Sequence, residues 1–183
     1  VADGFYGIED FNEDGTLLAD LPVPAFGSVQ PGDVKYLDLD RNGVVDQNDV
    51  TRIGRSAYPE WYFSFGGRFG YKGFDMQVLF QGVAGVSANL LDNWNQMVAF
   101  VDNGNAYNVA KGAWAYYPTE GIDNRANATY PRLTTQSNEN NYRTSSLWIK
   151  DASFLKLRNI EIGYNFASGK VKKSGISNLR VYL

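Results

Sequence analysis

Two neighbouring stretches of the chain alternate between apolar and small or polar residues, and this period of two constrains the fold more than any other feature. The first, at 61–71, reads WYFSFGGRFGY, and the second, at 74–81, reads FDMQVLFQ. Successive side chains of a β-strand point to opposite faces, so each stretch predicts a strand with one apolar and one polar face. Lys72 and Gly73 between them are a tight-turn signal. The sequence therefore predicts a long β-hairpin.

The apolar face of this hairpin is rich in aromatic residues. It holds Trp61, Phe63, Phe65, Phe69, Phe74, Met76, Val78 and Phe80, while Tyr62, Arg68, Asp75, Gln77 and Gln81 lie on the other face. Strands of about ten alternating residues suit a transmembrane barrel, whereas strands of soluble sheets are usually about five or six residues long. A soluble sheet that covers its own core would show the same alternation, so periodicity leaves both interpretations open.

Strand signals return towards the end of the chain. The expected strands are about 59–71, 74–85, 148–166 and 176–183. Leu155 and Leu157 share one parity, whereas Ile160 starts a series with the other, which predicts a β-bulge near Arg158 and Asn159. A last strand without a following partner leaves an open edge, so we expect the chain to be part of something larger.

A cation-binding motif precedes the hairpin, in the segment DVKYLDLDRNGVVDQND at 33–49. Oxygen-bearing side chains recur at alternate positions and Gly43 supplies a sharp turn, which is how one short loop surrounds a hard cation such as Ca²⁺. The expected ligands are Asp38, Asp40, Asn42, the carbonyl of Val44, Asp46 and Asp49. An EF-hand carries Glu at the position of Asp49, so we expect weaker binding, suited to extracellular calcium.

The same spacing has a second interpretation. Asp and Asn side chains also close local turns by accepting hydrogen bonds from their own backbone, without any metal. No helical pattern of apolar residues flanks 33–49, so the motif is a loop module and not a helix–loop–helix sensor.

Composition excludes several classes of function. The chain has 17 basic and 20 acidic residues, a balance that suggests no nucleic-acid partner. It has neither Cys nor His, which removes disulfide scaffolds, zinc sites of the usual kind, thiol nucleophiles and His-based triads. Twelve Tyr, eleven Phe and four Trp, together with many Gly and Asn, favour an all-β class.

The other parts of the chain lose the alternation. Gly and Pro punctuate 1–32, which reads as an irregular loop, and 86–147 is a long polar connection. Apolar residues recur at helical spacing within 87–101 and predict one short helix there. Exposed Trp and Tyr residues in this connection are candidates for sugar stacking, but we favour packing of the loop against its neighbours as the explanation for Trp94, Trp114, Tyr116 and Tyr117.

Four motifs in order resemble the C-terminal third of the SusC/RagA family of TonB-linked outer-membrane transporters. They are PGDVKYLDLDRNGVVDQNDVTRIG at 31–54, PEWYFSFGGRFGYKGFDMQVLFQG at 59–82, YPRLT at 130–134 and SSLWIKDASFLKLRNIEIGY at 145–164. The resemblance implies part of a 22-stranded transmembrane antiparallel β-barrel with long extracellular loops. It also implies uptake of glycans or peptides across the outer membrane, with a SusD-like surface lipoprotein as partner and TonB acting through parts that this sequence does not contain.

The resemblance also implies an orientation. The turn at Lys72-Gly73 and the segment 167–175 would be periplasmic, whereas 1–58, with the cation motif, and 86–147 would be extracellular. The apolar face of 59–183 would then meet lipid and the polar face would line the lumen.

Two other classes of function remain. One is a soluble, secreted, calcium-binding β-domain that binds carbohydrate or a protein partner. The other is an enzyme such as a glycosidase with two carboxylates, but no pair of Asp or Glu stands out, and we expect no enzyme and no catalytic residue. The sequence does not identify substrate-binding residues.

Overall fold

The computed structural model describes residues 1–166, 175–176 and 179–183. The chain divides into two compact units. The sheet unit comprises 55–87 and 151–183, and the loop unit comprises 1–54 and 88–150. No helix among the described residues is long and apolar enough to cross a membrane.

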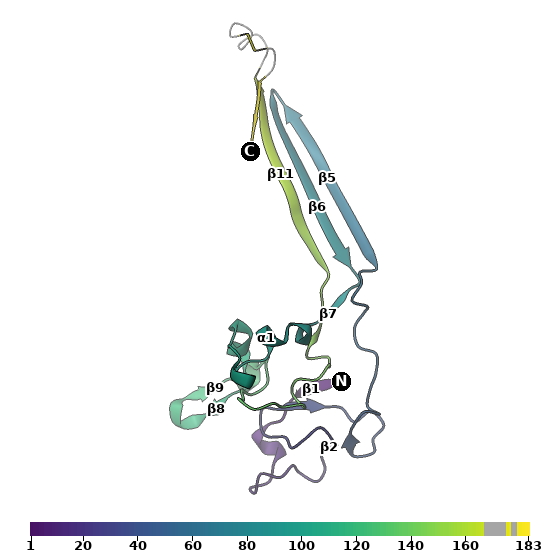
Figure 1. Ribbon diagram of the computed structural model, residues 1–183, viewed down its shortest axis with the longest axis vertical. Coiled ribbons are helices and arrows are strands. Elements are labelled where there is room, and N and C mark those ends of the chain that lie inside the picture. The colour runs from purple at the N-terminus through teal and green to yellow at the C-terminus, as the bar shows by residue number, and fades with distance from the viewer. Residues whose placement is uncertain (167–174, 177–178) are drawn as a thin grey trace. The chain divides into compact units, whose positions relative to one another are not determined.

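The sheet unit contains four antiparallel strands in the order β12-β11-β6-β5 (Figure 1). Their bounds are β5 Trp61–Tyr71, β6 Phe74–Ala84, β11 Phe154–Phe166 and β12 Leu179–Tyr182. β5 and β6 pair along their whole length, which confirms the predicted hairpin. Its two-residue turn has positive φ at both positions, 47° at Lys72 and 93° at Gly73, as turns that match the twist of the two strands require. The predicted turn at 167–175 lies almost entirely outside the described residues.

The pairing register gathers the apolar side chains on one face of this sheet. Phe65 pairs with Phe80, and Phe80 pairs with Leu157 on β11. The register then shifts, because Leu157 faces Phe80 whereas Asn159 faces Leu79, so that Arg158 is the extra residue of a bulge. The predicted bulge is confirmed.

One face of the sheet, here called the apolar face, is apolar from end to end. It is made of Trp61, Phe63, Phe65, Gly67, Phe69, Tyr71, Phe74, Met76, Val78, Phe80, Gly82, Ala84, Leu155, Leu157, Ile160, Ile162, Tyr164 and Phe166, with Leu179 and Val181 of β12. Many of these side chains are exposed, among them Trp61 at 68% and Phe69 at 63%. The sheet is open among the described residues, with β5 at one edge and β12 at the other.

The loop unit is built from short elements. β1 (Ala2–Phe5) pairs with β3 (Val34–Tyr36), β2 (Val23–Pro24) pairs with β4 (Val44–Val45), and β8 (Tyr116–Tyr117) pairs with β9 (Ile122–Asp123). Two further short strands, β7 (Ser87–Asn89) and β10 (Ile149–Asp151), pair with each other. The helical turns are η1 Ile8–Asp10, η2 Leu90–Asn93, α1 Trp94–Met97, η3 Val101–Asn103, η4 Asn108–Gly112, η5 Pro118–Glu120 and η6 Arg125–Asn127.

Two expectations for this unit are wrong in part. Residues 1–32 are not wholly irregular, because Ala2–Phe5 forms a strand with a partner about thirty residues along the chain, which local punctuation cannot reveal. The single helix expected over 87–101 shrinks to one α-helical turn. Asn89 is extended and its side chain caps the N–H of Leu91, and Asn93 has non-helical angles between the two turns, so helical spacing persists without a continuous helix.

The loop unit has two buried clusters of its own. The larger one surrounds Tyr130 and Trp148, which are 0% and 2% exposed. The hydroxyl of Tyr130 donates to the carbonyl of Met97 and accepts from the N–H of Ala99. The smaller cluster contains Val34, Tyr36 and Val45. These long loops are therefore packed structures, and Trp94 contributes by meeting Tyr142 edge to face.

Candidate functional site

The predicted cation loop follows β3 and includes β4. Its chain reversal falls at Arg41 and Gly43, which have positive φ values of 61° and 85°. Gly43 adopts such angles without the steric cost that a Cβ would add. β4 then anchors the far side of the loop, because Val23 donates to the carbonyl of Gly43 and Ala25 donates to that of Val45.

Three of the predicted ligands converge. Asp38, Asp40 and Asp49 each offer one carboxylate oxygen within 4.8 Å of the others. The loop backbone holds these side chains: the N–H groups of Arg41 and Gly43 donate to Asp38 at 2.6 and 2.7 Å, and those of Leu39 and Asp46 donate to Asp49 at 2.6 and 2.8 Å. Oxygen atoms of carboxylates are the ligands that Ca²⁺ prefers, so the donor set of this triad fits a hard cation.

The other predicted ligands serve local turns. The side chain of Asn42 accepts from the N–H of Val44 at 2.8 Å, and that of Asp46 accepts from the N–H of Asn48 at 2.6 Å. Asp46 does not join the triad of carboxylates. The Asx-turn interpretation therefore accounts for these two residues, and it also applies to Asp38 and Asp40, which accept hydrogen bonds from backbone N–H groups of the loop. The triad differs in that its three carboxylates converge.

The carboxylates of the triad differ in proton affinity. Desolvation, followed by contact with Asp38 and the charge of Asp49, raises the pKa of Asp40 against a hydrogen bond from the N–H of Asn42 that lowers it. Hydrogen bonds from backbone N–H groups, that of Asp46 first, lower the pKa of Asp49 although its desolvation opposes them. Asp49 is 6% exposed and is the buried base of the loop, whereas Asp40 is exposed. A cation at the triad would relieve the mutual repulsion that Asp40 experiences.

A second polar centre, which sequence reasoning missed, lies at Asp33. This side chain is 0% exposed and is fully hydrogen-bonded. It accepts from Nε of Arg132 at 2.6 Å, from Nδ2 of Asn141 at 2.8 Å, from Nδ2 of Asn138 at 3.2 Å and from the N–H of Gln30 at 2.8 Å. Asp33 opens the cation segment and Arg132 belongs to the YPRLT motif. The presence of both motifs in one chain was the signal available for this centre, but the sequence alone does not show that Asp33 and Arg132 contact each other.

The same polar centre completes β3. Asn141 Oδ1 accepts from the N–H of Val34 at 2.8 Å, and Asn140 Nδ2 donates to the carbonyl of Val34 at 2.8 Å. Two side-chain amides thus replace a neighbouring strand on the edge of β3 that β1 leaves open. Tyr36, at the end of β3, donates its hydroxyl to the carbonyl of Asn140 at 2.7 Å. The segment that leads into the cation loop is fixed on both sides.

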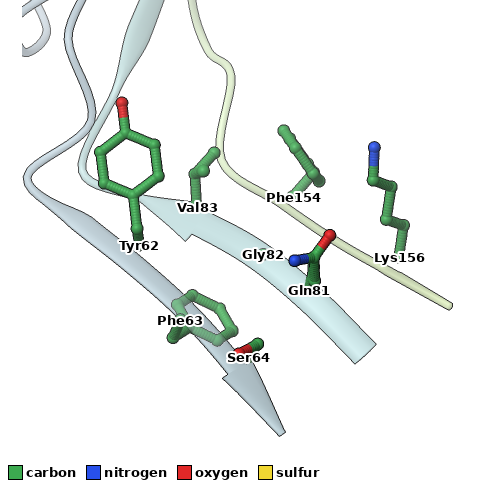
Figure 2. Close-up of a pocket in the computed structure, with 8 residues that line it drawn as sticks. All are labelled: Tyr62, Phe63, Ser64, Gln81, Gly82, Val83, Phe154 and Lys156. Carbon is green, nitrogen blue, oxygen red and sulfur yellow. The ribbon is translucent and has the colours of Figure 1, made fainter. Parts of the chain in front are cut away.

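A shallow pocket of about 290 Å³ lies on the sheet unit. Tyr62, Val83 and Phe154 form one row across β5, β6 and β11, and Ser64, Gln81 and Lys156 form the next. Figure 2 shows both rows on the strands, with Phe63 beside them. The aromatic ring of Phe63 covers Gly82, because a Cβ at Gly82 would lie 2.6 Å from Phe63 Cζ.

Charged groups cluster further along the polar face. Arg180 of β12 pairs with Asp75 on β6 and with Glu161 on β11, the latter at 2.6 Å. Arg68 donates to Gln77 at 2.8 Å. In these cross-strand contacts, charged and polar side chains of the polar face are paired with one another.

Comparison with known proteins identifies the relationship. No protein-family model matches the chain. It is 29% identical over 157 residues to TonB-dependent receptor P3 of Formosa agariphila (strain DSM 15362 / KCTC 12365 / LMG 23005 / KMM 3901 / M-2Alg 35-1), a match that covers 86% of this chain and 14% of that receptor. It is 26% identical over 172 residues to TonB-dependent receptor P26 of the same organism, covering 92% of this chain and 16% of the receptor. The chain thus spans about one seventh of the length of these curated relatives.

Solved structures agree in fold. The RagAB peptide importer in its closed-closed state matches 100% of this chain and 18% of the solved chain, with a TM-score of 0.56 and 18% identity. Its open-open state matches 99% of this chain with a TM-score of 0.55 and 18% identity. These relatives are receptors and an importer, in agreement with the prediction that the chain is not an enzyme. The resemblance expected from the four motifs is confirmed: the chain is homologous to a segment of the TonB-dependent receptors and has the fold of the corresponding segment of the RagAB importer.

Proposed function

We propose that this chain is part of an outer-membrane, TonB-dependent nutrient importer that takes up glycans or peptides together with a SusD-like surface lipoprotein. The observation that carries the proposal is the apolar face of the sheet, which runs unbroken across four strands and is exposed at side chains as large as Trp61 and Phe69. A water-exposed face of this kind would cost about 25 cal/mol for each Å² of apolar surface left uncovered.

The lengths of the strands support a membrane-spanning role. β5 and β6 have 11 residues each and β11 has 13. Eleven residues of an antiparallel strand extend about 37 Å, and a tilt of about 45° reduces that to the roughly 25 Å apolar band of outer-membrane barrels. Lipid would then cover the apolar face, and the polar face with Arg68, Asp75 and Gln77 would border the lumen.

The loop unit supports the surface role in this proposal. Its packed clusters and the polar centre at Asp33 hold long segments in a defined shape, as a platform for a lipoprotein lid or cargo requires. In this proposal Ca²⁺ binds the loop through Asp38, Asp40 and Asp49, and the predicted carbonyl of Val44 and side chains of Asn42 and Asp46 complete the shell directly or through water. The carbonyls of Gly43 and Val45 are already used by Val23 and Ala25, and carbonyls alternate in direction along a strand, so that of Val44 is left for the loop.

Site-directed labelling tests the membrane assignment. The sequence described here contains no Cys, so Phe65→Cys and Ser64→Cys, each made with any Cys elsewhere in the complete protein replaced, form a matched pair on opposite faces of β5. In the complete protein in lipid vesicles, we expect the thiol introduced by Phe65→Cys to react with a lipid-soluble maleimide and to resist a water-soluble one. The thiol introduced by Ser64→Cys should show the reverse. Equal reaction of both variants with the water-soluble reagent would instead support the soluble, calcium-binding β-domain.

A further inference from the structure

A cavity of about 310 Å³ lies within the loop unit, beside the cation loop. Its walls are mostly apolar and include Leu37, Val45, Val50, Ile53 and Ile149. Asp46 and Asp49 also line it, but their carboxylate oxygens accept hydrogen bonds from backbone N–H groups of the loop itself. The volume lies at the small end of the range for ligand pockets, so the cavity suits a small ligand such as the last residue of a peptide.

Arg143 supplies a positively charged side chain to this cavity. Its guanidinium carbon lies 3.1 Å from the centroid of the Phe26 ring, and both residues line the cavity. Among the described residues, Arg143 takes part in none of the ion pairs and none of the side-chain hydrogen bonds. Arginine is always charged, and a guanidinium stacked on a ring keeps its N–H edge free for a planar acceptor. A carboxylate partner would stabilise a half-buried guanidinium of this kind.

Two other arginines of the loop unit each face a carboxylate of the chain, whereas the exposed Arg41 and Arg52 take part in none of the ion pairs among the described residues. Arg125 also stacks on an aromatic ring, that of Tyr116 at 3.9 Å, but it pairs with Asp123 at 2.7 Å. Arg132 pairs with Asp33 at 2.6 Å. In both cases a carboxylate of the chain faces the guanidinium, whereas among the described residues Arg143 has none.

Hydroxyl groups stand next to Arg143 on the cavity wall. Thr144 is exposed, and Ser145 is 2% exposed with an Oγ that lies close to the hydroxyl of Tyr36 but makes none of the well-formed hydrogen bonds among the described residues. A buried hydroxyl in that state is usually satisfied by water or by a ligand. The wall thus offers a cation, polar hydroxyls and an apolar recess in one place.

We propose that this cavity captures the C-terminal end of a peptide that finishes in an aliphatic residue. The terminal carboxylate accepts two parallel N–H bonds from Arg143, and the last side chain enters the recess formed by Val45, Val50 and Ile53. Capture of a chain-terminal carboxylate is an established mode of peptide recognition. The inference rests on the proposed import function and narrows it, since it names peptides with a free aliphatic C-terminus as the cargo.

Binding of a matched pair of peptides to the complete protein in detergent tests this proposal. The probes are acetyl-Ala-Ala-Leu with a free carboxylate and the same peptide with a C-terminal amide, compared by calorimetry. We expect the acid to bind about tenfold or more tightly than the amide, because charge-assisted bonds are about twice as strong as neutral ones. Equal binding of acid and amide, or binding of neither, would overturn the proposal without any variant having to fold.

Two arginine variants identify the residue. Arg143→Gln should remove the preference for the acid, whereas Arg125→Gln, which alters an arginine stacked in the same way outside the cavity, should keep it. An Arg143→Gln protein that still prefers the acid would place the carboxylate elsewhere and contradict the proposal. Uptake by cells is measured separately: peptide binding without uptake would count against the import function, and uptake with equal binding of acid and amide would count against this cavity.

Discussion

Nε of Arg132 lies 2.6 Å from Oδ1 of Asp33, a carboxylate that is completely buried, although 99 residues separate the two in the chain. This contact joins the start of the cation segment to the YPRLT motif. The same carboxylate receives the amide of Asn141, whose own oxygen holds the N–H of Val34. One ion pair therefore connects the long connection after the hairpin to the strand that enters the cation loop.

We expect Arg132→Ala to loosen both segments at once. Removal of the arginine leaves the Asp33 carboxylate buried with only neutral donors, and breaking a buried pair costs about 3–5 kcal/mol, with a value of about 2–4 kcal/mol more suitable here because the Arg132 side chain is 25% exposed. Hydrogen exchange should accelerate at 33–36 and at 138–142 together. Asp123–Arg125 is a matched control on the surface, and Arg125→Ala should leave exchange at both segments unchanged. Faster exchange in one segment alone would contradict the coupling.

The triad predicts opposite signs for two neighbouring substitutions in the absence of metal. The pKa of Asp49 is lowered in the folded protein, so Asp49 stabilises the fold above its unfolded pKa of about 3.9, and that contribution is lost as the pH falls through the lower folded pKa. The pKa of Asp40 is raised, so its charge opposes folding at neutral pH. With a chelator present, Asp49→Asn should lower the melting temperature and Asp40→Asn should raise it. The same sign for both would refute this description of the loop.

Calcium should reverse the effect at Asp40. With a cation bound, its carboxylate is a ligand and no longer a source of repulsion, so Ca²⁺ at about millimolar concentration should raise the melting temperature of the natural chain and have little effect on Asp40→Asn. Protons compete for the same oxygens, so the apparent affinity for Ca²⁺ should fall as the pH is lowered towards the raised pKa of Asp40. An identical calcium shift in both proteins would exclude Asp40 from the site.

The parts of the fold and of the site that could be predicted from the sequence depend on residues that are close together in the chain. Alternation over 61–81, the turn at Lys72-Gly73, and the spacing of Asp38 and Asp40 each depend on a few consecutive positions whose geometry is fixed by the backbone. The role of Asp33 depends on partners about a hundred residues away, and no local pattern encodes such a distance. The prediction of one helix over 87–101 was wrong for a local reason. The apolar residues have helical spacing, but Asn89 and Asn93 have non-helical backbone angles that interrupt the helix.

A charge on the apolar face should be costly, and the same charge one residue away should not. Phe65 stacks on Phe80 with ring centroids 5.2 Å apart, and Ser64 lies on the opposite face beside Gln81. Lysine on the lipid face of a barrel costs about 2–4 kcal/mol near the midplane. If the sheet belongs to a membrane barrel as proposed, Phe65→Lys in the complete protein should lower the yield of the folded, heat-modifiable form on gels, and Ser64→Lys should leave that yield nearly unchanged. Equal yields would argue against a lipid-facing Phe65.

A bulge at Arg158 lets β11 keep one apolar face along its whole length. Leu157 pairs with Phe80 and Ile160 pairs with Val78, and both side chains reach the same side because Arg158 between them is left out of the pairing. Deletion of Arg158 leaves Leu157 and Ile160 two positions apart, so regular alternation keeps both on the apolar face. We expect the deletion variant of the complete protein to assemble in detergent with unchanged heat modifiability on gels. Deletion of both Arg158 and Asn159 shifts the parity and should prevent assembly. Failed assembly of the single-deletion variant, or normal assembly of the double-deletion variant, would contradict this role of the bulge.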